Sequence, residues 1–596
     1  MKSDNYKITQ YSVSSILNYV ENSQIAIPEI QRPFVWKGEE VRALIDSLYE
    51  GYPIGYLIVW QNSQVRVRGF GKGGTKKILI DGQQRVTALM AALLGKEVLD
   101  EQYQSCRIRI AFNPLAQTGD ERFAVCDEKH EQDSKWIPDI SIFFRRDFSF
   151  RQFEKEYKEA NPGEDFTPLE ESVDTLKEIV KHQVGVIELS FLLDIDVVSE
   201  IFIRINLQGK PLNQEDFVMS KISVNEEYGG DYIRNCIDYF CHLLREPSFY
   251  QVLQQNETDF FNSEYGQAVA WCQNGEKNLY IPSYADVLKV VLISYFGKVR
   301  IGDLVHLLSG RIGEKKGLTK KEISKKLSEE SFEKLGAGVK AFVCEKNFKG
   351  FQKALKKAGY CCSRLLYSQS VLNYCYAMYL LMDRQGIGEE EKESLLARWM
   401  TMVMLTGHYQ SGGEGTVLKD YANATEEGFA SYLAQIEELK LTEEFYDSIL
   451  PDKFASTTAR TAPFLVYVAT QCARGVHSLY SDVTIEELYK NKTESYQILP
   501  KTYLAKCGYK TREIYGQVAN LTYISKETKD IVKRKAPADY REKLEEIIGR
   551  EAITASLQEN GLTEKIFTAG EKDVTKILAD RRKQMALEIK EFYKTL

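Results

Sequence analysis

The stretch Lys77-Ile78-Leu79-Ile80-Asp81-Gly82-Gln83-Gln84-Arg85-Val86-Thr87-Ala88-Leu89-Met90 decides how the first part of this chain folds. Residues 78–80 are apolar and rich in β-branched side chains, which is typical of a buried strand. Gly82 allows backbone angles that a Cβ atom would forbid, so the chain can turn sharply there. From Val86 onward apolar residues recur at helical spacing. The stretch therefore predicts a strand, a one-glycine turn and a helix.

Polar residues 81–85 stand at the predicted junction between strand and helix. The first amides of a helix have no partner within the helix, and together with the helix dipole they favour an anion. Arg85 adds a cation whose planar fork matches a phosphate group. The alternative is an ordinary solvated turn in which Arg85 makes a surface ion pair. Spacing alone does not choose between these two interpretations.

Three further blocks accompany this motif. Ile27–Trp36 and Gly51–Gly55 precede it in the sequence, and Ile201–Asn213 follows it. Together with Asp81-Gly82-Gln83-Gln84-Arg85 they resemble the N-terminal domain of GmrSD-like restriction and phage-defence proteins, over roughly residues 10–225. That resemblance implies a ParB/sulfiredoxin-like fold that binds and hydrolyses a nucleotide. It also implies that the protein handles foreign, often modified, DNA.

The resemblance assigns roles to individual residues. Asp81 and Arg85 are the implied catalytic pair, with Asp81 binding Mg²⁺ or orienting water. Gly82, Gln83, Gln84 and Arg85 would hold the phosphates of ATP or GTP. Three residues from the other blocks are implied at the same nucleotide site: Gln31, Arg32 and Asn206. For Arg32 a plain surface position, and for Asn206 a role in shaping a turn, remain open.

Length predicts several domains, because 596 residues exceed what one core usually holds. Mixed strand and helix signals extend to about residue 225, and strands are expected at 57–60, 106–112 and 185–189. From about 226 to 440 apolar residues follow helical periods. The expected fold class is α+β, with a ParB/sulfiredoxin-like domain at 1–225, an all-α domain at 226–440 and an α-rich domain at 441–596.

The last segment resembles the His-Asn-His nuclease domain that closes many GmrSD-like proteins, but it departs from the family pattern. Tyr496 and Gln497 stand where the histidine pair belongs, Lys529 stands at a later Asn position, and Asn520 is retained. Such a nuclease needs a histidine to activate water and side chains that hold a divalent cation. We therefore predict a degenerate domain that does not cut DNA. A nuclease that uses other residues is the alternative.

Charge is unevenly distributed along the chain. The net charge is −7, whereas residues 491–596 hold 21 Lys and Arg against 16 Asp and Glu, a local balance of +5. This asymmetry is consistent with a DNA-binding face near the C-terminus. The candidate cations are Lys533-Arg534-Lys535 and Arg581-Arg582-Lys583. A solvated helical surface balanced by nearby carboxylates would have the same composition.

The sequence disfavours a membrane-spanning protein, a protein with an N-terminal signal segment and a metal-binding protein. No apolar run approaches the ~20 residues of a membrane span, and the N-terminus has no apolar signal core. The six histidines form no pair at metal-ligand spacing, and the eleven cysteines contain no Cys-x-x-Cys. Together with the resemblance to GmrSD-like proteins, this composition leads us to expect a cytoplasmic defence protein that binds NTP and senses modified or phage-derived DNA. The same resemblance leaves room for a partner protein of the defence system and for a homo-oligomer. The alternatives are a non-catalytic subunit that binds a DNA modification, and an active endonuclease.

Overall fold

The computed structural model describes residues 5–22, 24–26, 34, 36–62, 76–99, 105–117, 120–193, 197–198, 201, 214–310, 320–568, 570 and 573–596. The chain divides into two compact units, residues 1–234 and residues 235–596. The fold is mixed: the sheet lies in the first unit and the second unit is rich in helices, which confirms the predicted α+β class. The ParB/sulfiredoxin-like assignment and the boundary expected near residue 440 stay predictions.

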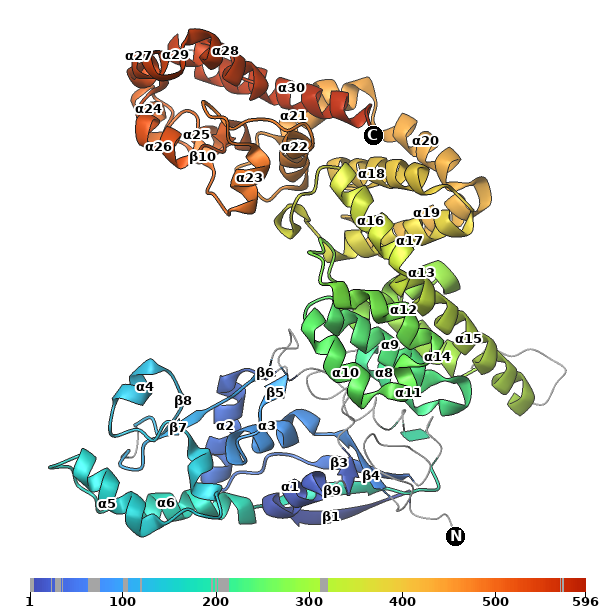
Figure 1. The fold of residues 1–596 in the computed structure, drawn as a ribbon, viewed down its shortest axis with the longest axis vertical. Coiled ribbons are helices and arrows are strands. Elements are labelled where there is room, and N and C mark those ends of the chain that lie inside the picture. The colour runs from blue at the N-terminus through green and yellow to red at the C-terminus, as the bar shows by residue number, and fades with distance from the viewer. Residues whose placement is uncertain are drawn as a thin grey trace. The chain divides into compact units, whose positions relative to one another are not determined.

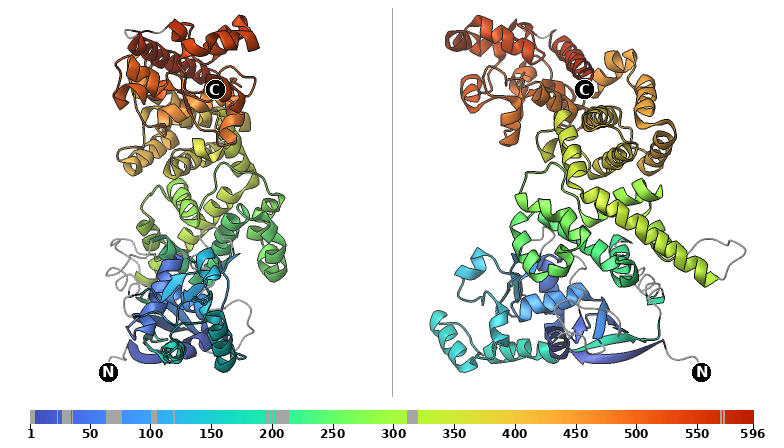
Figure 2. Two further views of the ribbon diagram at one scale, coloured as in Figure 1. Left: turned by 90° about the vertical axis from the view of Figure 1, so that its left-hand side faces the viewer. Right: turned by 45° about the vertical axis from the view of Figure 1, so that its right-hand side comes forward.

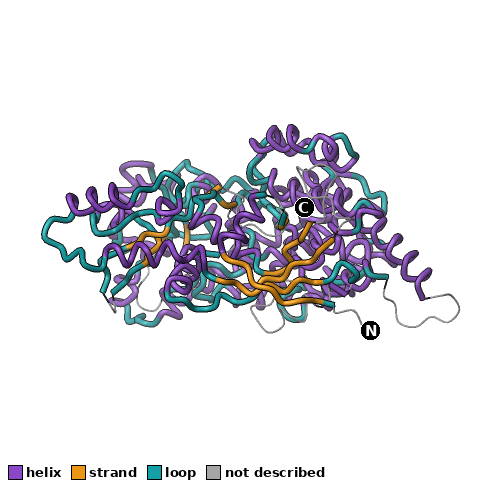
Figure 3. The backbone as a smooth tube through the Cα atoms, turned by 90° about the horizontal axis from the view of Figure 1, so that it is seen from below, coloured by secondary structure: helices purple, strands orange, loops and turns teal. Residues whose placement is uncertain are grey.

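The first unit is built on a five-stranded mixed sheet (Figure 3). The strands follow the order β1-β9-β3-β4-β2, with β1 at Tyr6–Ser12, β9 at Gln183–Leu189, β3 at Leu57–Asn62, β4 at Lys76–Asp81 and β2 at Ile25–Ala26. β1 pairs antiparallel with β9, which runs parallel to β3. β4 is antiparallel to β3 and parallel to β2. The central strands thus join segments more than a hundred residues apart in sequence.

Alternation along β3 explains how the sheet carries two apolar faces. Leu57 and Val59 point into the main core, which also contains side chains of the helices α1 (Val13–Glu21), α2 (Gly38–Tyr49) and α3 (Gln83–Leu93). Ile58 and Trp60 point the other way, into a smaller cluster with Leu189. Successive side chains of a strand face opposite sides, so an apolar run of this kind indicates a strand covered on both faces. Figure 1 shows the three helices beside these strands.

The elements between α3 and β9, at residues 98–181, form a lobe of the first unit. Short strand pairs join β5 (Val98–Leu99) to β6 (Ser105–Cys106) and β7 (Ile110–Phe112) to β8 (Phe123–Val125). The strand predicted at 106–112 is therefore divided, whereas those predicted at 57–60 and 185–189 are present. Helices complete the lobe: α4 at Glu128–Gln132, η1 at Ile140–Phe144, α5 at Phe150–Ala160, α6 at Leu169–Glu178 and η2 at Ile179–Lys181.

The region from α8 to α22 is helical (Figure 2): α8 lies in the first unit, α9 crosses the boundary at residue 234, and the later helices belong to the second unit. The first part of this region contains α8 Gln214–Val224, η3 Glu226–Tyr228, α9 Gly230–Leu243, η4 Pro247–Phe249, α10 Tyr250–Asn256, α11 Thr258–Phe261, α12 Glu264–Val269, η5 Ala270–Asn274, α13 Tyr284–Phe296, α14 Ile301–Leu308, α15 Lys320–Val343 and α16 Glu345–Lys357. It continues with η6 Ser363–Leu365, α17 Gln369–Arg384, α18 Glu389–Thr406, α19 Gly413–Glu427, α20 Phe429–Lys440, η7 Phe445–Ile449, α21 Leu450–Lys453 and α22 Ala462–Ala473.

The last 120 residues or so fold around one short strand pair, β10 (Tyr496–Gln497) with β11 (Leu521–Thr522). The helices are α23 Ile485–Lys490, α24 Lys501–Lys506, α25 Arg512–Tyr515, η8 Val518–Asn520, α26 Lys526–Val532, α27 Pro537–Ile548, α28 Arg550–Glu559, α29 Lys565–Thr568 and α30 Val574–Tyr593. None of the helices in the described part of the chain has the length and apolarity that crossing a membrane requires.

Candidate functional site

The predicted strand, turn and helix are present as β4, Gly82 and α3. Gly82 has φ 95° and ψ 11°, a left-handed conformation that disfavours any residue with a Cβ. A Cβ built at this position would lie 2.2 Å from Cδ2 of Leu57, so packing against β3 also excludes a side chain. Gly82 is the N-cap of α3 and offers no side chain to its first amides. β4 therefore leads through Gly82 directly into α3, and the N-terminus of α3 has no side-chain cap.

Arg85 lies in the first turn of α3 and is held by two contacts. Its Nη2 donates to Oδ2 of Asp81 at 3.0 Å, and its Nη1 donates to the carbonyl oxygen of Ile54 at 3.0 Å. About one fifth of each of the Arg85 and Asp81 side chains is exposed. The guanidinium is thus fixed by protein groups and still open to solvent. Arg85 makes the ion pair that an ordinary turn would have. Its guanidinium is also partly exposed, as a phosphate-binding cation would be.

Gly55 is a site residue that the sequence reasoning missed. Its φ is +88°, and a Cβ placed on it would lie 2.7 Å from Nη1 of Arg85. Together with the Ile54 carbonyl, Gly55 therefore forms a seat for the guanidinium. The Gly51–Gly55 block was the available signal, because a second glycine so close to a proline indicates a turn with unusual backbone angles.

The other predicted nucleotide ligands divide into two groups. Gln83 and Gln84 are partly buried at the start of α3, and Nε2 of Gln83 donates to the carbonyl of Leu79 at 2.9 Å. That bond ties the helix back to β4. Gln31, Arg32 and Asn206 lie outside the described residues, so their assignment stays a prediction.

A cation would have one clear ligand at this turn. The pair with Arg85 uses Oδ2 of Asp81, which leaves Oδ1 as the oxygen suited to Mg²⁺. Mg²⁺ commonly takes only one or two carboxylates and completes its shell with water and substrate phosphates. No group of three or more His, Cys, Asp or Glu residues suited to a metal ion occurs in the part of the chain that the structure describes. At this turn Asp81 can therefore supply one carboxylate oxygen to a divalent cation.

A second polar feature, also missed from sequence, surrounds the buried carboxylate of Glu188 on β9. Its Oε2 lies 2.8 Å from Nζ of Lys7 and its Oε1 lies 2.6 Å from Nζ of Lys77, while the Tyr11 hydroxyl donates to the same carboxylate. Burial alone would raise the pKa of Glu188, but the hydrogen bonds from the two lysines and the tyrosine lower it to about 2. These contacts join β1, β9 and β4 across the sheet.

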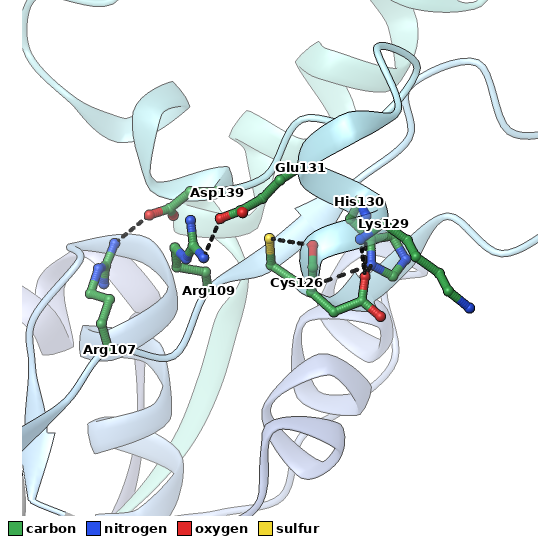
Figure 4. Close-up of polar contacts among 8 residues, drawn as sticks. Arg107, Arg109, Cys126, Lys129, His130, Glu131 and Asp139 are labelled. Carbon is green, nitrogen blue, oxygen red and sulfur yellow. Dashed lines mark hydrogen bonds and ion pairs between the residues drawn. The ribbon is translucent and has the colours of Figure 1, made fainter.

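Arg107 and Arg109 extend from the segment before β7 toward a group of polar residues (Figure 4). Nη2 of Arg107 lies 2.6 Å from Oδ2 of Asp139, and its Nη1 donates to the carbonyl of Ala91 near the C-terminus of α3. Arg109 pairs with Glu131 on α4 at 2.5 Å. Arg107 therefore stabilises the end of α3 opposite to the Asp81 turn.

Cys126, in the same group, does not have the features of a reactive thiol. Burial raises its pKa, and this effect exceeds the opposing influence of Arg109. Its Sγ contacts the backbone carbonyl of Asp127. The group in Figure 4 holds the lobe together and does not provide an activated nucleophile.

The residues compared above with the nuclease pattern lie in the second unit. Tyr496 and Gln497 form β10, Asn520 directly precedes β11, and Lys529 lies on α26. Tyr496 pairs with Thr522 in the strand register, and its hydroxyl donates to the carbonyl of Lys533, just after α26. Burial raises the pKa of Tyr496 to about 12. Nε2 of Gln497 donates to the Tyr515 carbonyl at 3.2 Å. Lys529 is exposed on α26.

Asn520 is fully buried and is committed to the backbone. Its Oδ1 accepts from the Leu499 amide at 2.9 Å, and its Nδ2 donates to the carbonyls of Leu499 and Tyr515 at 2.9 and 3.0 Å. The side chain thereby pins the segment after β10 to the segment before β11. The side chain of Asn520 therefore positions these two backbone segments.

The two predicted basic segments differ in exposure. Lys533, Arg534 and Lys535 are all exposed after α26. The prediction for the second segment is wrong at Arg581, which is 2% exposed and donates through Nη1 to the carbonyls of Ala519 and Leu521. Arg581 lies on the inner face of α30, where it satisfies buried backbone and cannot meet a phosphate. Glu588, one of the carboxylates near this basic segment in the sequence, is also buried.

Comparison with known families supports the assignment of the first unit. Residues 13–223 match the model of the GmrSD restriction endonuclease N-terminal domain. The match contains the Asp81–Arg85 turn and the other three motif blocks. No curated protein matched the chain. The resemblance inferred from the motifs is therefore confirmed for this region: residues 13–223 belong to the GmrSD restriction endonuclease N-terminal domain family.

Proposed function

We propose that this protein acts in restriction of, or defence against, foreign DNA, and that its N-terminal domain binds and hydrolyses ATP or GTP at the Asp81–Arg85 turn. The observation that carries the proposal is the seat of Arg85, which Asp81 and Ile54 hold in the first turn of α3. A guanidinium has five N–H donors, and these two bonds use two of them. Donors remain for a phosphate that also accepts from the first amides of α3.

This arrangement supports the following roles for the residues at the proposed site. Arg85 stabilises negative charge on the transferred phosphoryl group, as cations do in other phosphoryl-transfer sites. Asp81 either holds Mg²⁺ through Oδ1 or orients the attacking water. Bound Mg²⁺ would neutralise phosphate charge. Gln83 and Gln84 lie on the same turn, where their amides can contact the nucleotide.

DNA, modified or phage-derived, is the proposed macromolecular partner. The matched family is described as a restriction endonuclease domain, and exposed Lys533, Arg534 and Lys535 offer cations for backbone phosphates. We do not assign cleavage to the C-terminal segment, because Tyr496 and Gln497 occupy positions that nuclease chemistry would give to histidine. A partner protein of the defence system would supply any cleavage.

The test measures nucleotide hydrolysis and DNA cleavage side by side on the purified full chain, with ATP and GTP, with Mg²⁺, and with unmodified and modified duplexes. Hydrolysis that depends on Arg85, without strand cleavage, is the expected result. Binding of modified DNA without any hydrolysis would favour a non-catalytic recognition subunit instead. Metal-dependent cleavage by the chain alone would overturn the assignment of the C-terminal segment.

A further inference from the structure

Residues 501–535 of the second unit carry exposed cations that have no carboxylate partners. The segment holds nine Lys and Arg against three Asp and Glu, and all nine cations are exposed. None of the nine makes an ion pair within the part of the chain that the structure describes. The ion pairs that flank the segment join Lys490 to Glu486 before it and Arg541 to Glu545 after it. The positive charge of residues 501–535 is therefore not offset by ion pairs.

Strand β10 brings cations from three helices together. Nε2 of Gln497 donates to the carbonyl of Tyr515 at 3.2 Å, and Nζ of Lys501 lies 4.9 Å from the centre of the Tyr515 ring. The Tyr496 hydroxyl donates to the carbonyl of Lys533 at 3.1 Å. Because α25 ends at Tyr515 and Lys533 follows α26, the start of α24, the end of α25 and the end of α26 border the same strand (Figure 1).

Two more cations lie about one helical turn from these contacts. Arg512 precedes Tyr515 on α25, and Lys529 precedes Lys533 on α26. With the exposed residues that follow α26 they make a set that we call the β10 surface. Its members are Lys501, Arg512, Lys529, Lys533, Arg534 and Lys535.

The chain turns sharply at Lys533, within the β10 surface. Lys533 has φ 48° and ψ −126°, a conformation that residues with a Cβ rarely adopt. Its amide donates to the carbonyl of Lys529 at 2.8 Å, and its own carbonyl accepts from Tyr496. Strained residues of this kind persist only where the surroundings hold them. The two bonds therefore fix the turn that ends α26 beside β10.

The chemistry of the β10 surface suits phosphate and not a metal ion. All three departures from the nuclease pattern lie here, because Tyr496 and Gln497 form β10 and Lys529 lies on α26. An ammonium group repels a divalent cation and attracts a phosphate. Each duplex phosphate that a lysine or arginine neutralises releases counterions, which favours binding. Since the cations come from three helices, they suit a polymer of phosphates better than a single small anion.

We propose that the β10 surface binds the phosphate backbone of duplex DNA without a divalent cation and leaves the strands uncut. The inference rests on the proposed function, which makes DNA the partner, and it adds Lys501, Arg512 and Lys529 to the three cations considered above. Their charged groups neutralise the phosphates where a nuclease would use a metal ion. Phosphate contacts carry no direct sequence information, so this surface holds DNA whatever its bases.

The test measures binding of a fluorescent DNA duplex to the full chain by anisotropy, across a salt series, with Mg²⁺ and with EDTA. EDTA should not weaken binding. Changing Lys501, Arg512 and Lys529 together to alanine should weaken binding at least tenfold. It should also flatten the log–log dependence on salt by up to about 2.7, because each duplex phosphate contributes about −0.9.

The matched control changes Lys298, Arg300 and Lys334 to alanine. These residues have the same composition, are exposed, make no ion pair in the described structure and lie elsewhere in the second unit. Affinity and salt dependence should stay close to the wild-type values. Single variants guard against a folding defect: Lys529→Arg should retain binding and Lys529→Gln should weaken it, with the thermal midpoint unchanged in both.

Three results would overturn the proposal: loss of binding in EDTA, equal effects of the two triple variants, and tighter binding of a single strand than of a duplex of the same length. DNA binding that is insensitive to the first triple variant would exclude the β10 surface and leave the proposed function standing. If the wild-type chain binds no DNA at all, the proposed DNA partner fails together with this inference. Arg85→Ala should abolish nucleotide hydrolysis and leave binding at the β10 surface intact, so a failure of the NTP site is seen separately.

Discussion

Arg85 reaches back from the first turn of α3 to the carboxylate of Asp81, at 3.0 Å between Nη2 and Oδ2. The two residues stand four positions apart across a turn that only a left-handed glycine can make. A strand end and a helix start are thereby joined by an ion pair next to uncapped amides. The ion pair therefore fixes the positions of the Arg85 and Asp81 charges at the start of α3.

Replacement of Arg85 by alanine should weaken ATP or GTP binding by about tenfold to a hundredfold, because a charged hydrogen bond is worth roughly 1.5–3 kcal/mol. The side chain is partly exposed, so the fold should persist. Titration with a non-hydrolysable nucleotide and thermal unfolding measure the two effects separately.

Arg42→Ala is the control for this variant. Arg42 lies on α2 and makes a surface pair with Glu39, at 2.9 Å. Its loss removes the same chemical group from the same unit, away from the turn. Equal nucleotide affinity in wild type and Arg85→Ala would contradict the phosphate site.

Gly55→Ala should also lower nucleotide affinity, because its Cβ would displace the Arg85 guanidinium. Gly163→Ala provides the comparison: Gly163 has φ +93°, close to the +88° of Gly55, but a Cβ there meets nothing within 4 Å. Both variants carry the backbone strain of ~1–2 kcal/mol expected for a left-handed alanine. A similar loss of nucleotide binding in both would show that strain, and not the seat of Arg85, is responsible.

The network around Glu188 predicts a pH dependence of stability. The folded-state pKa of Glu188 is about 2, below the value of ~4.3 for an unperturbed glutamate. The folded protein therefore binds this proton less readily, and the stabilisation is complete above about pH 5 and is lost as the pH falls toward 2. Denaturant unfolding between pH 7 and pH 3 should show this loss. Glu188→Gln should be less stable at pH 7 and should depend less on pH; an unchanged slope would contradict the assignment.

Local patterns predicted the strand, turn and helix at 77–90, because β-branching, one glycine and a helical period all act within a few residues. The partners of this site were not predictable in the same way. The Ile54 carbonyl lies 31 residues from Arg85 in sequence, and Lys77 lies 111 residues from Glu188. Such contacts depend on strand order, which a single sequence does not specify.

The error at Arg581 has a different cause. Reading 581–583 as a run of charge ignored the helical period, which places Arg581 on the same face as Leu578, Met585 and Glu588. That face is buried. Projection of the triplet onto a helix would have separated Arg581 from exposed Lys583.

Asn520→Ala should destabilise the C-terminal region by about 2–4 kcal/mol, because it leaves buried backbone groups of Leu499 and Tyr515 without partners. Chemical denaturation with a probe in this region measures the effect. Asn520→Asp keeps the acceptor but turns a buried carboxylate oxygen toward the carbonyls of Leu499 and Tyr515, so it should destabilise the region at least as much as Asn520→Ala. A fully stable Asn520→Ala variant that alters only DNA processing would contradict the positioning role.

Lys533, Arg534 and Lys535 supply the last prediction, which concerns how DNA is held. If the three exposed side chains neutralise duplex phosphates, the logarithm of the binding constant should fall linearly with the logarithm of salt concentration, with a slope of about −0.9 for each phosphate. Changing all three to alanine should flatten that slope by up to about 2.7. The matched control changes three exposed lysines of α16, Lys353, Lys356 and Lys357, and alters the net charge equally. Flattening by the first triple variant alone places the phosphates beside α26. Equal flattening by both variants would mean that only the total charge matters, and no change in either would leave the N-terminal domain as the DNA-binding part.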